Sequence, residues 1–166
     1  SRLTLKKYQQ GETVLEAGRI CRKLYFIEAG LLRYYQPRDG EQVTKYFTVA
    51  PYCFTVQRSL TEESPSPDGI MALEDSLIWE MSKEDAFDLF RLLNWNTFIR
   101  KLIQEVQFNT EKILEELQQQ TAEERYRSLL EQQGELIQRI QLKYLASYLG
   151  IAPQSLSRIR KRLSGS

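Results

Sequence analysis

Apolar and polar residues alternate in short runs through residues 1–81 of the chain. The runs are rich in β-branched and aromatic residues, and turn-forming residues interrupt them roughly every eight to twelve residues. Strands are expected at Val14–Leu15, Leu24–Ile27, Leu31–Tyr35, Val43–Phe47, Ile70–Ala72 and Leu77–Met81. Many short strands at even spacing predict a β-sandwich or barrel for this part of the chain.

Glycine occurs in each expected turn between these strands, because it adopts the backbone conformations that tight turns require. The turns are expected at Gly11–Glu12, Ala17–Gly18, Ala29–Gly30, Pro37–Gly40 and Asp68–Gly69. The stretch from Leu60 to Asp68 is rich in Thr, Glu, Ser and Pro, so we expect it to be a mobile loop between strands.

The hydrophobic period changes from two residues to about 3.6 residues at Ser82. Ser82 and Asp85 have the Ser-x-x-acid spacing of a capping box, which predicts a short helix that reaches Leu93. We expect Asn94–Asn96 to break this helix and a long helix to follow over 97–119.

The long helix carries one narrow apolar seam on an otherwise polar surface. Its members step by threes and fours: Ile99, Ile103, Val106, Thr110, Ile113 and Leu117. Such a seam is typical of a helix that packs against a partner helix, and pairing with its twin would make the protein a parallel dimer. The alternative is that the seam packs on the strand domain of the same chain.

A second capping box, formed by Thr121 and Glu124, predicts another helix that runs to about Gln133 and is ended by Gly134. Two shorter helices should follow it. The first has one apolar face, made of Leu142, Leu145, Ala146 and Leu149.

A tight turn separates these last two helices. Gly150 ends the first with a left-handed backbone, and Pro153 starts the second because its φ is preset for a first helical position. The second helix has an inward stripe of Leu156, Ile159 and Leu163 and an outward side of Gln154, Ser155, Arg158, Lys161 and Arg162. This is the plan of a helix-turn-helix motif, whose second helix enters the DNA major groove, although any helical hairpin can show the apolar pattern.

Positive charge is concentrated at this end of the chain. Six basic residues and no acidic residue follow position 138: Arg139, Lys143, Arg158, Arg160, Lys161 and Arg162. Because the whole chain carries +1 and these six contribute +6, residues 1–138 carry −5. Cations gathered on a helix pair are typical of binding to a phosphate backbone. In the alternative interpretation, Arg160–Arg162 only oppose the helix dipole.

The remaining composition excludes several classes of function. The chain has no histidine, which removes Ser-His-Asp and Cys-His catalysis and histidine-ligated zinc or haem. Cys21 and Cys53 are isolated in sequence, so we interpret both as buried small hydrophobes. We expect no enzyme, no cofactor and no metal. Since neither a long apolar run nor a secretory leader is present, we expect a cytoplasmic protein with no membrane partner.

The order of these parts resembles the Crp/Fnr family of bacterial transcription regulators over nearly the whole chain. The motifs that carry the resemblance are Tyr8-x-x-Gly11-Glu12, Leu15-x-x-Gly18, Leu24–Ile27 followed by Gly30, Ala122–Tyr126, and Leu142-x-x-Leu145-Ala146-x-x-Leu149-Gly150 followed by Leu156–Ile159. The segments Ala122–Tyr126 and Leu156–Lys161 most resemble the branch common in Bacteroidetes.

Membership of this family would imply an α+β protein of three parts. They are a cyclic-nucleotide-binding-like jelly-roll sensor domain at residues 1–93, a connecting dimerisation helix at residues 94–120 and a helix-turn-helix DNA-binding domain at residues 121–166. The resemblance also implies a homodimer that binds a palindromic site in double-stranded DNA, with RNA polymerase as a further partner.

The expected ligand site departs from the family pattern. Members that bind cyclic AMP carry a Gly-Glu pair for the backbone and ribose and an Arg-Ser pair for the cyclic phosphate. Aligned on that cassette, this chain has Thr55-Val56 and Ser66-Pro67 instead. A buried phosphate without its cation costs on the order of several kcal/mol, so we expect no tight binding of cyclic AMP. Arg58 is either a substitute cation or a surface arginine, and an unknown small-molecule effector stays open.

The resemblance also assigns roles in DNA binding. Arg158 matches a base-reading arginine, which can bind guanine O6 and N7 together, and Gln154 lies at a base-reading position and could read adenine. The residues expected to hold phosphates are Lys143, Ser155, Lys161, Arg162 and Arg139. Two competing interpretations are a ligand sensor that acts through protein partners and an enzyme on a cupin-like jelly roll, which the absence of histidine disfavours.

Overall fold

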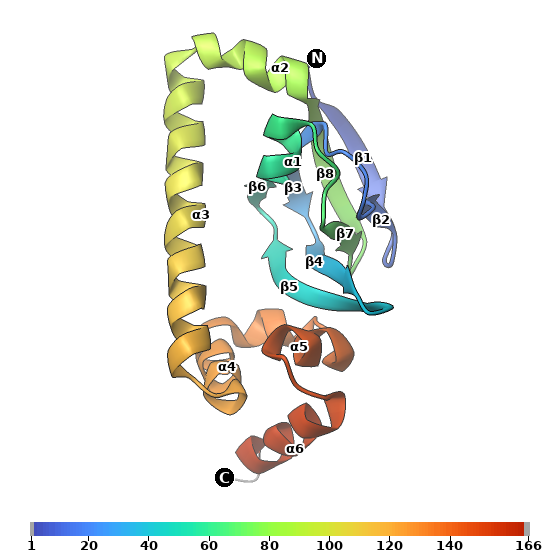
Figure 1. The fold of residues 1–166 in the computed structure, drawn as a ribbon, viewed down its shortest axis with the longest axis vertical. Coiled ribbons are helices and arrows are strands. Elements are labelled where there is room, and N and C mark those ends of the chain that lie inside the picture. The colour runs from blue at the N-terminus through green and yellow to red at the C-terminus, as the bar shows by residue number, and fades with distance from the viewer. Residues whose placement is uncertain (1, 165–166) are drawn as a thin grey trace. The chain divides into compact units, whose positions relative to one another are not determined.

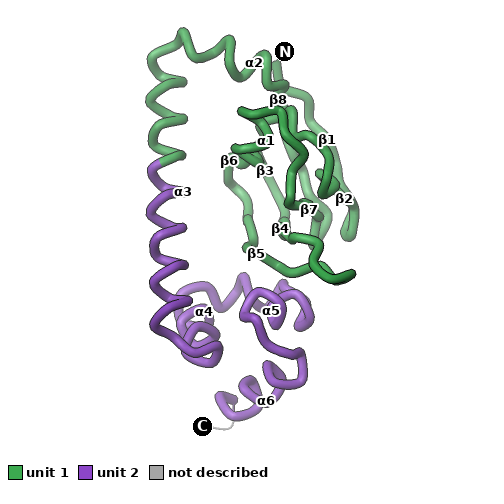
Figure 2. Tube along the Cα trace, viewed as in Figure 1, with its two compact units in different colours: residues 1–103 green, residues 104–166 purple. Residues whose placement is uncertain are grey.

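The computed structural model describes residues 2–164 as an α+β protein (Figure 1). The helices in chain order are α1 (Gln57–Glu62), α2 (Lys83–Asp88), the 3-10 helix η1 (Leu89–Arg91), α3 (Leu93–Gln119), α4 (Ala122–Gln138), α5 (Leu142–Leu149) and α6 (Pro153–Ser164). The chain forms two compact units, residues 1–103 and 104–166, and the boundary between them falls inside α3 (Figure 2). Within residues 2–164, no helix is both long and apolar enough to cross a membrane.

The first unit is built on a sandwich of two four-stranded antiparallel sheets, with the orders β1-β8-β3-β6 and β2-β7-β4-β5. The strands are β1 (Thr4–Tyr8), β2 (Thr13–Leu15), β3 (Lys23–Ala29), β4 (Leu31–Arg38), β5 (Glu41–Val49), β6 (Tyr52–Phe54), β7 (Gly69–Ala72) and β8 (Ser76–Ser82). Every strand expected from the sequence is present, so the predicted sandwich is confirmed. The fold fits a jelly roll of the cyclic-nucleotide-binding type.

Two strands, β1 and β6, were not expected from the sequence pattern. In β1 only Tyr8 is buried, so its other residues read as a polar segment although they pair with β8. β6 spans three residues, which is too short to display an alternating pattern. Both strands are defined by the neighbours with which they pair and not by their own sequence.

Side chains from both sheets fill the interior of the sandwich. Each is at most 8% exposed: Tyr8, Leu15, Cys21, Tyr25, Ile27, Leu32, Tyr34, Phe54, Val56, Ile70, Ala72 and Ile78. In this interior Tyr25 stacks on Phe54, with 5.0 Å between ring centres. The buried Tyr34 also stacks on the more exposed ring of Tyr46, with 4.2 Å between ring centres. Removal of this apolar surface from water is the main force that holds the sheets together.

Both cysteines are buried free thiols, as expected. Burial raises the pKa of the Cys53 thiol to about 12. Because the thiolate is the reactive form, Cys53 is protected against oxidation at neutral pH.

A buried carboxylate, Glu80 on β8, links three strands of one sheet. It accepts hydrogen bonds from the Tyr8 hydroxyl of β1 and the Lys23 ammonium of β3, both at 2.5 Å. Burial by itself opposes the charge, but the hydrogen bonds from Lys23 and Tyr8 outweigh it, so the pKa of Glu80 lies below its ordinary value.

The stretch from Leu60 to Asp68, expected to be a loop, begins inside a helix, and residues 63–68 form the loop between α1 and β7. Helix α1 covers its start, and Leu60 is buried. The buried Ser66 donates its hydroxyl hydrogen to the Asp68 carbonyl oxygen at 2.7 Å, and Lys45 pairs with the Asp68 carboxylate at 2.8 Å. The polar side chains of this stretch therefore satisfy groups inside the fold, whereas composition alone assigns them to solvent.

Helix α2 begins at the predicted N-cap, where the Asp85 backbone N–H donates to the Ser82 hydroxyl at 3.0 Å. The Asp85 carboxylate accepts from the Ser82 hydroxyl at 2.9 Å and not from its backbone N–H, so the two residues form only half of the predicted capping box. The predicted break at Asn94–Asn96 is wrong, because these residues lie inside α3. The chain breaks instead at Leu92, which has an extended backbone (φ −91°, ψ 124°). Asn96 lies in the first turn of α3, and its backbone N–H donates to the Leu92 carbonyl oxygen at 3.1 Å, so the helix continues through this asparagine.

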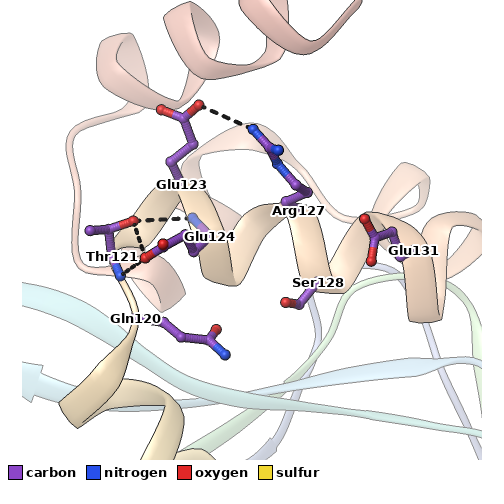
Figure 3. Close-up of a pocket in the computed structure, with 7 residues that line it drawn as sticks. All are labelled: Gln120, Thr121, Glu123, Glu124, Arg127, Ser128 and Glu131. Atoms are coloured by element: carbon purple, nitrogen blue, oxygen red, sulfur yellow. Dashed lines mark hydrogen bonds and ion pairs between the residues drawn. The ribbon is translucent and has the colours of Figure 1, made fainter.

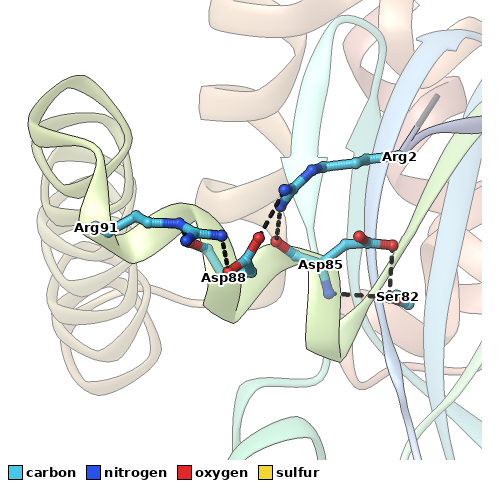
Figure 4. Close-up of polar contacts among 5 residues, drawn as sticks. All are labelled: Arg2, Ser82, Asp85, Asp88 and Arg91. Carbon is cyan, nitrogen blue, oxygen red and sulfur yellow. Dashed lines mark hydrogen bonds and ion pairs between the residues drawn. The ribbon is translucent and has the colours of Figure 1, made fainter.

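Arg2 ties the start of the chain to α2 (Figure 4). Its guanidinium pairs with Asp88 at 2.6 Å and donates to the Asp85 carbonyl oxygen at 3.4 Å. Asp88 also pairs with Arg91. The hydrogen bonds from Arg91 and Arg2 hold the pKa of the Asp88 carboxyl below its ordinary value.

The start of α3 packs on the sandwich, and the later part of its apolar seam does not. Trp95, Ile99 and Leu102 pack against a cluster of Leu24, Cys53, Met81 and Ala86. Packing on the same chain, the alternative given above, therefore applies to Ile99. Of the later seam residues, Ile103, Val106, Thr110 and Leu117 are exposed and Ile113 is half-buried.

In the second unit, α4 is kinked where the sequence predicts its end. Gln133 has a non-helical backbone (φ −142°, ψ 38°), yet a further helical turn follows and α4 continues to Gln138. The expectation that Gly134 ends the helix is therefore wrong by one turn. Two buried side chains after the start of α4, Tyr126 and Ile137, lie on opposite sides of the kink and both join the core of this unit.

Candidate nucleic-acid interface

Helices α5 and α6 are joined by a three-residue turn, Gly150–Ala152. Gly150 has a left-handed backbone (φ 72°, ψ 29°), and the Ile151 backbone N–H donates back to the Ala146 carbonyl oxygen at 3.0 Å. These are the features of a Schellman-type helix end. Pro153 is the first residue of α6, as predicted, so both ends of the turn are confirmed.

The inward faces of the two helices are buried in the core of this unit, to which α4 and the residue Ile140 also contribute. Its members are at most 7% exposed: Tyr126, Ile137, Ile140, Leu145, Ala146, Leu149, Leu156 and Ile159. Leu142 and Leu163, also predicted to face inward, are only half-buried because they lie at the outer ends of their helices. This core fixes the rotation of α6, and therefore which of its side chains face outward.

The start of α4 is held by hydrogen bonds between Thr121 and Glu124 (Figure 3). Its predicted capping box is confirmed: the Glu124 backbone N–H donates to the Thr121 hydroxyl at 3.3 Å, and the Thr121 backbone N–H donates to the Glu124 carboxylate at 2.7 Å. Arg125 on the next turn donates to the Leu149 carbonyl oxygen at 2.6 Å. Because Leu149 is the last residue of α5, this bond holds the start of the turn against α4.

The outward side of α6 carries the side chains that the sequence assigns to DNA. Gln154, Arg158, Lys161 and Arg162 are exposed, and Ser155 is half-buried. Within residues 2–164, neither the Arg158 guanidinium nor the Lys161 ammonium has a hydrogen-bond or ion-pair partner. The two cations are thus available to an external anion.

Two other cations of α6 are engaged with α4. The Arg160 guanidinium lies over the Tyr126 ring, 5.7 Å from its centre, on the inward flank of the helix. The Arg162 guanidinium pairs with Glu123. The contacts of Glu123 with Arg162 and of Arg125 with Leu149 were not predicted from the sequence. They join residues 39 and 24 positions apart, so no local pattern indicates them.

The remaining predicted phosphate-binding residues lie on α5 and at the end of α4. Lys143 is exposed, and its ammonium lies 4.7 Å from the centre of the Tyr144 ring. Arg139 is exposed and is the C-cap of α4. A phosphate could therefore approach either side chain from solvent without displacing any part of the core.

In the first unit, the residues at the expected cassette positions are buried or hydrogen-bonded within the protein. The Thr55 hydroxyl donates to the Lys23 carbonyl oxygen at 2.8 Å, Val56 is buried, and the buried Ser66 is bonded to Asp68 as described above. Arg58 is exposed on α1 and pairs with Glu62 at 3.0 Å. The structure does not bring Arg58 together with the buried residues of the cassette.

The sandwich with α1 between β6 and β7 has the architecture of a nucleotide-sensing jelly roll. The family model described as "Cyclic nucleotide-binding domain" matches residues 5–92. The chain belongs to the cyclic nucleotide-binding domain family. A comparison with curated protein sequences found no match.

Solved structures have the same fold over nearly the whole chain. FixK2 from Bradyrhizobium japonicum is 16% identical, with a TM-score of 0.84 over 98% of this chain and 85% of that one. A CooA variant from Carboxydothermus hydrogenoformans is 14% identical, with a TM-score of 0.79 over 99% and 77%. A protein described as a Crp/Fnr-family transcriptional regulator, from Eubacterium rectale, is 16% identical, with a TM-score of 0.77 over 98% and 78%. At these identities the likeness shows a shared fold, and activity must be argued from this chain's own residues.

The left-handed turn can be tested with two glycines that differ only in backbone conformation. An added Cβ meets no atom within 4 Å at Gly150 or at Gly134, but only Gly150 has a positive φ. Gly150→Ala should therefore lower the free energy of unfolding by about 1–2 kcal/mol. Gly134→Ala should leave it unchanged or raise it by up to about 1 kcal/mol. Urea unfolding followed by circular dichroism measures both, and equal effects would contradict a special role for the turn.

Proposed function

We propose that the chain is a DNA-binding transcription regulator of the Crp/Fnr type in which α5 and α6 are a helix-turn-helix motif. The observation that carries this proposal is the outward side of α6, where the charged groups of Arg158 and Lys161 are exposed and have no partner among the described residues. The opposite side of the same helix is held by buried Leu156 and Ile159. A helix so anchored presents a fixed row of donors, as recognition in the major groove requires.

Different residues of this surface have different roles in the proposal. Arg158 reads guanine and Gln154 reads adenine, because a guanidinium and an amide can each bind two atoms of one base edge. Lys143, Ser155, Lys161, Arg162 and Arg139 bind phosphates without reading sequence. RNA polymerase and a small-molecule effector are further proposed partners, and the Bacteroidetes-type branch stays a prediction.

A sequence-specific site can be isolated by sequencing the genomic fragments that the purified protein retains at about 0.15 M salt, where weak phosphate attraction is screened. On that site, Arg158→Ala should lose preference at one base pair of each half-site, by about 1–3 kcal/mol. Arg158→Lys keeps the charge but not the paired donors, so it should lose the same preference and retain affinity for random duplex.

Lys143→Ala is the matched control for this experiment, because it should weaken specific and random duplex about equally. Equal losses on both duplexes for every variant would contradict base reading by Arg158. A failure to retain any fragment would instead favour the sensor that acts through protein partners.

We also propose that α3 pairs with its twin in a parallel homodimer. The seam residues step four, three, four, three and four from Ile99 to Leu117, as in the a and d positions of a coiled coil. In the single chain Ile103 is 46% exposed and Leu117 is 54% exposed. A second copy of the helix would remove this apolar surface from water.

The dimer can be tested by placing one charge on or off the seam. Val106→Glu should give a monomer, because a carboxylate would be buried between the helices. Phe108→Glu is the control: Phe108 is 67% exposed and lies about 200° around the helix from Val106, away from the seam. Sedimentation velocity at micromolar concentration should show dimers for the wild type and Phe108→Glu only. Monomers of all three proteins would refute the pairing.

Finally, we propose that the jelly roll does not bind cyclic AMP tightly. The support comes from Thr55 and Ser66, which lie at the two cassette positions and whose hydroxyls donate to carbonyl oxygens of the protein. Neither residue is a cation that could neutralise a buried phosphate. A ligand at 100 times its dissociation constant would add about 2.7 kcal/mol to the free energy of unfolding. Cyclic AMP and cyclic GMP at millimolar concentration should therefore leave the melting temperature unchanged. A rise in melting temperature that Arg58→Ala abolishes would overturn this and assign the phosphate to Arg58.

A further inference from the structure

Arg125 lies in the first turn of α4, and its side chain reaches the end of α5. The Arg125 backbone N–H donates to the Thr121 carbonyl oxygen at 3.0 Å, which makes this residue part of the first hydrogen-bonded turn after the capping box. Its half-buried side chain donates through the guanidinium to the Leu149 carbonyl oxygen at 2.6 Å. Neither a local sequence pattern nor the comparisons with solved structures assign a role to this arginine.

The Arg125 bond and a backbone bond hold the two edges of one peptide group. The Leu149 carbonyl oxygen and the Gly150 N–H belong to the same peptide group, which is planar. The Gly150 N–H donates to the Ser147 carbonyl oxygen at 3.1 Å, and Arg125 binds the oxygen on the opposite edge. Two bonds therefore set the orientation of this plane at the start of the left-handed turn, and one of them comes from another helix.

The direction of α6 depends on the orientation of this peptide group, because only the turn Gly150–Ala152 separates α5 from Pro153. Gln154 and Arg158 lie beyond the turn, in a helix that rises about 1.5 Å per residue. A tilt of about 10° at the turn displaces a group about 10 Å away by about 2 Å, whereas a binding group must be held within about 0.5 Å. A small change at the turn is thus enough to misplace both side chains.

We infer that Arg125 is a positioning residue for base reading, which sets the direction in which α6 presents Gln154 and Arg158 by holding the Leu149 carbonyl oxygen. This inference rests on the proposed function. The guanidinium faces the carbonyl end of α5, where the partial negative charge of the helix dipole strengthens its bond. Arg125 acts through the turn and contacts neither a base nor a phosphate.

The alternative is that Arg125 only stabilises the fold. The three helices are already held together by buried apolar side chains, among them Tyr126, Leu149 and Leu156. The Arg125 Nε–H is enclosed and has no hydrogen-bond partner among residues 2–164, which offsets part of the stability that the bond to Leu149 contributes. The place of that bond, at the turn and not in the core, favours the positioning role.

The test measures preferences for single base pairs in the operator isolated above. Each preference is the ratio of the affinities for the operator and for a copy altered at one base pair. Both affinities are measured on one protein sample, so a smaller folded fraction leaves the ratio unchanged. Loss of preference in Arg158→Ala and in Gln154→Ala identifies the base pair that each side chain reads.

Arg125→Met is the variant to compare, because methionine keeps most of the apolar stem and removes the donors. Arg127→Met is the matched control on the same helix. Arg127 is exposed, and its guanidinium lies 3.8 Å from the Glu123 carboxylate. Both variants remove one positive charge, so they should weaken binding to a random duplex about equally.

Arg125→Met should lose preference at both base pairs, each by about tenfold, although Gln154 and Arg158 are unchanged. Arg158→Ala, by contrast, should lose preference at its own base pair only. Arg125→Lys should keep both preferences within about threefold of the wild type, because one ammonium can donate to one carbonyl oxygen. Arg127→Met should keep both preferences.

Unchanged preferences in Arg125→Met would overturn the inference, and so would an unfolded Arg125→Met protein, seen by circular dichroism, which would establish the structural role. Loss at the base pair of Arg158 alone would also contradict it, because a change in the direction of α6 affects both readers. These results leave the proposed function intact, since it requires only that the wild type prefers its operator. A wild-type protein without such a preference would refute the proposed function, and this inference with it.

Discussion

The candidate interface depends on the packing of α5 against α6 across the left-handed turn at Gly150. Ala146 is fully buried, and its small side chain lets the two helices approach closely at the point where Ile151 bonds back to it. Each residue of an α-helix is displaced by about 100° from the last, so a shift of one position in this packing would rotate Arg158 out of the exposed face. The apolar contacts on the inner side of α6 therefore determine the chemistry of its outer side.

Positive charge at the end of the chain is divided by the fold into two groups. A count of basic residues treats Arg158, Arg160, Lys161 and Arg162 alike, and the sequence offers no reason to separate them. In the structure, Arg160 packs on Tyr126 and Arg162 pairs with Glu123, whereas Arg158 and Lys161 face solvent. Part of the local charge thus stabilises the domain, and only the rest is free to attract a nucleic acid.

Features with local causes could be predicted from the sequence, and features with distant causes could not. The helix starts at Ser82 and Thr121 and the turn at Gly150 each depend on residues within four positions, and all three were predicted correctly. Strand β1 and the ordered stretch around Ser66 depend on partners far along the chain, and both were missed. The same holds for the contact between Glu123 and Arg162, so the outward face of α6 could be predicted but not this contact with α4.

The apolar seam of α3 has a consequence for control if the proposed dimer is the DNA-binding form. Its later residues are exposed in the single chain, so the free energy gained by covering them is realised only when two chains meet. Mass action then makes the population of dimers rise with the square of the protein concentration while monomers predominate. If the jelly roll also binds no nucleotide, as proposed above, the rates of synthesis and degradation would themselves carry the signal, because a twofold change in the amount of protein gives about a fourfold change in the amount of dimer.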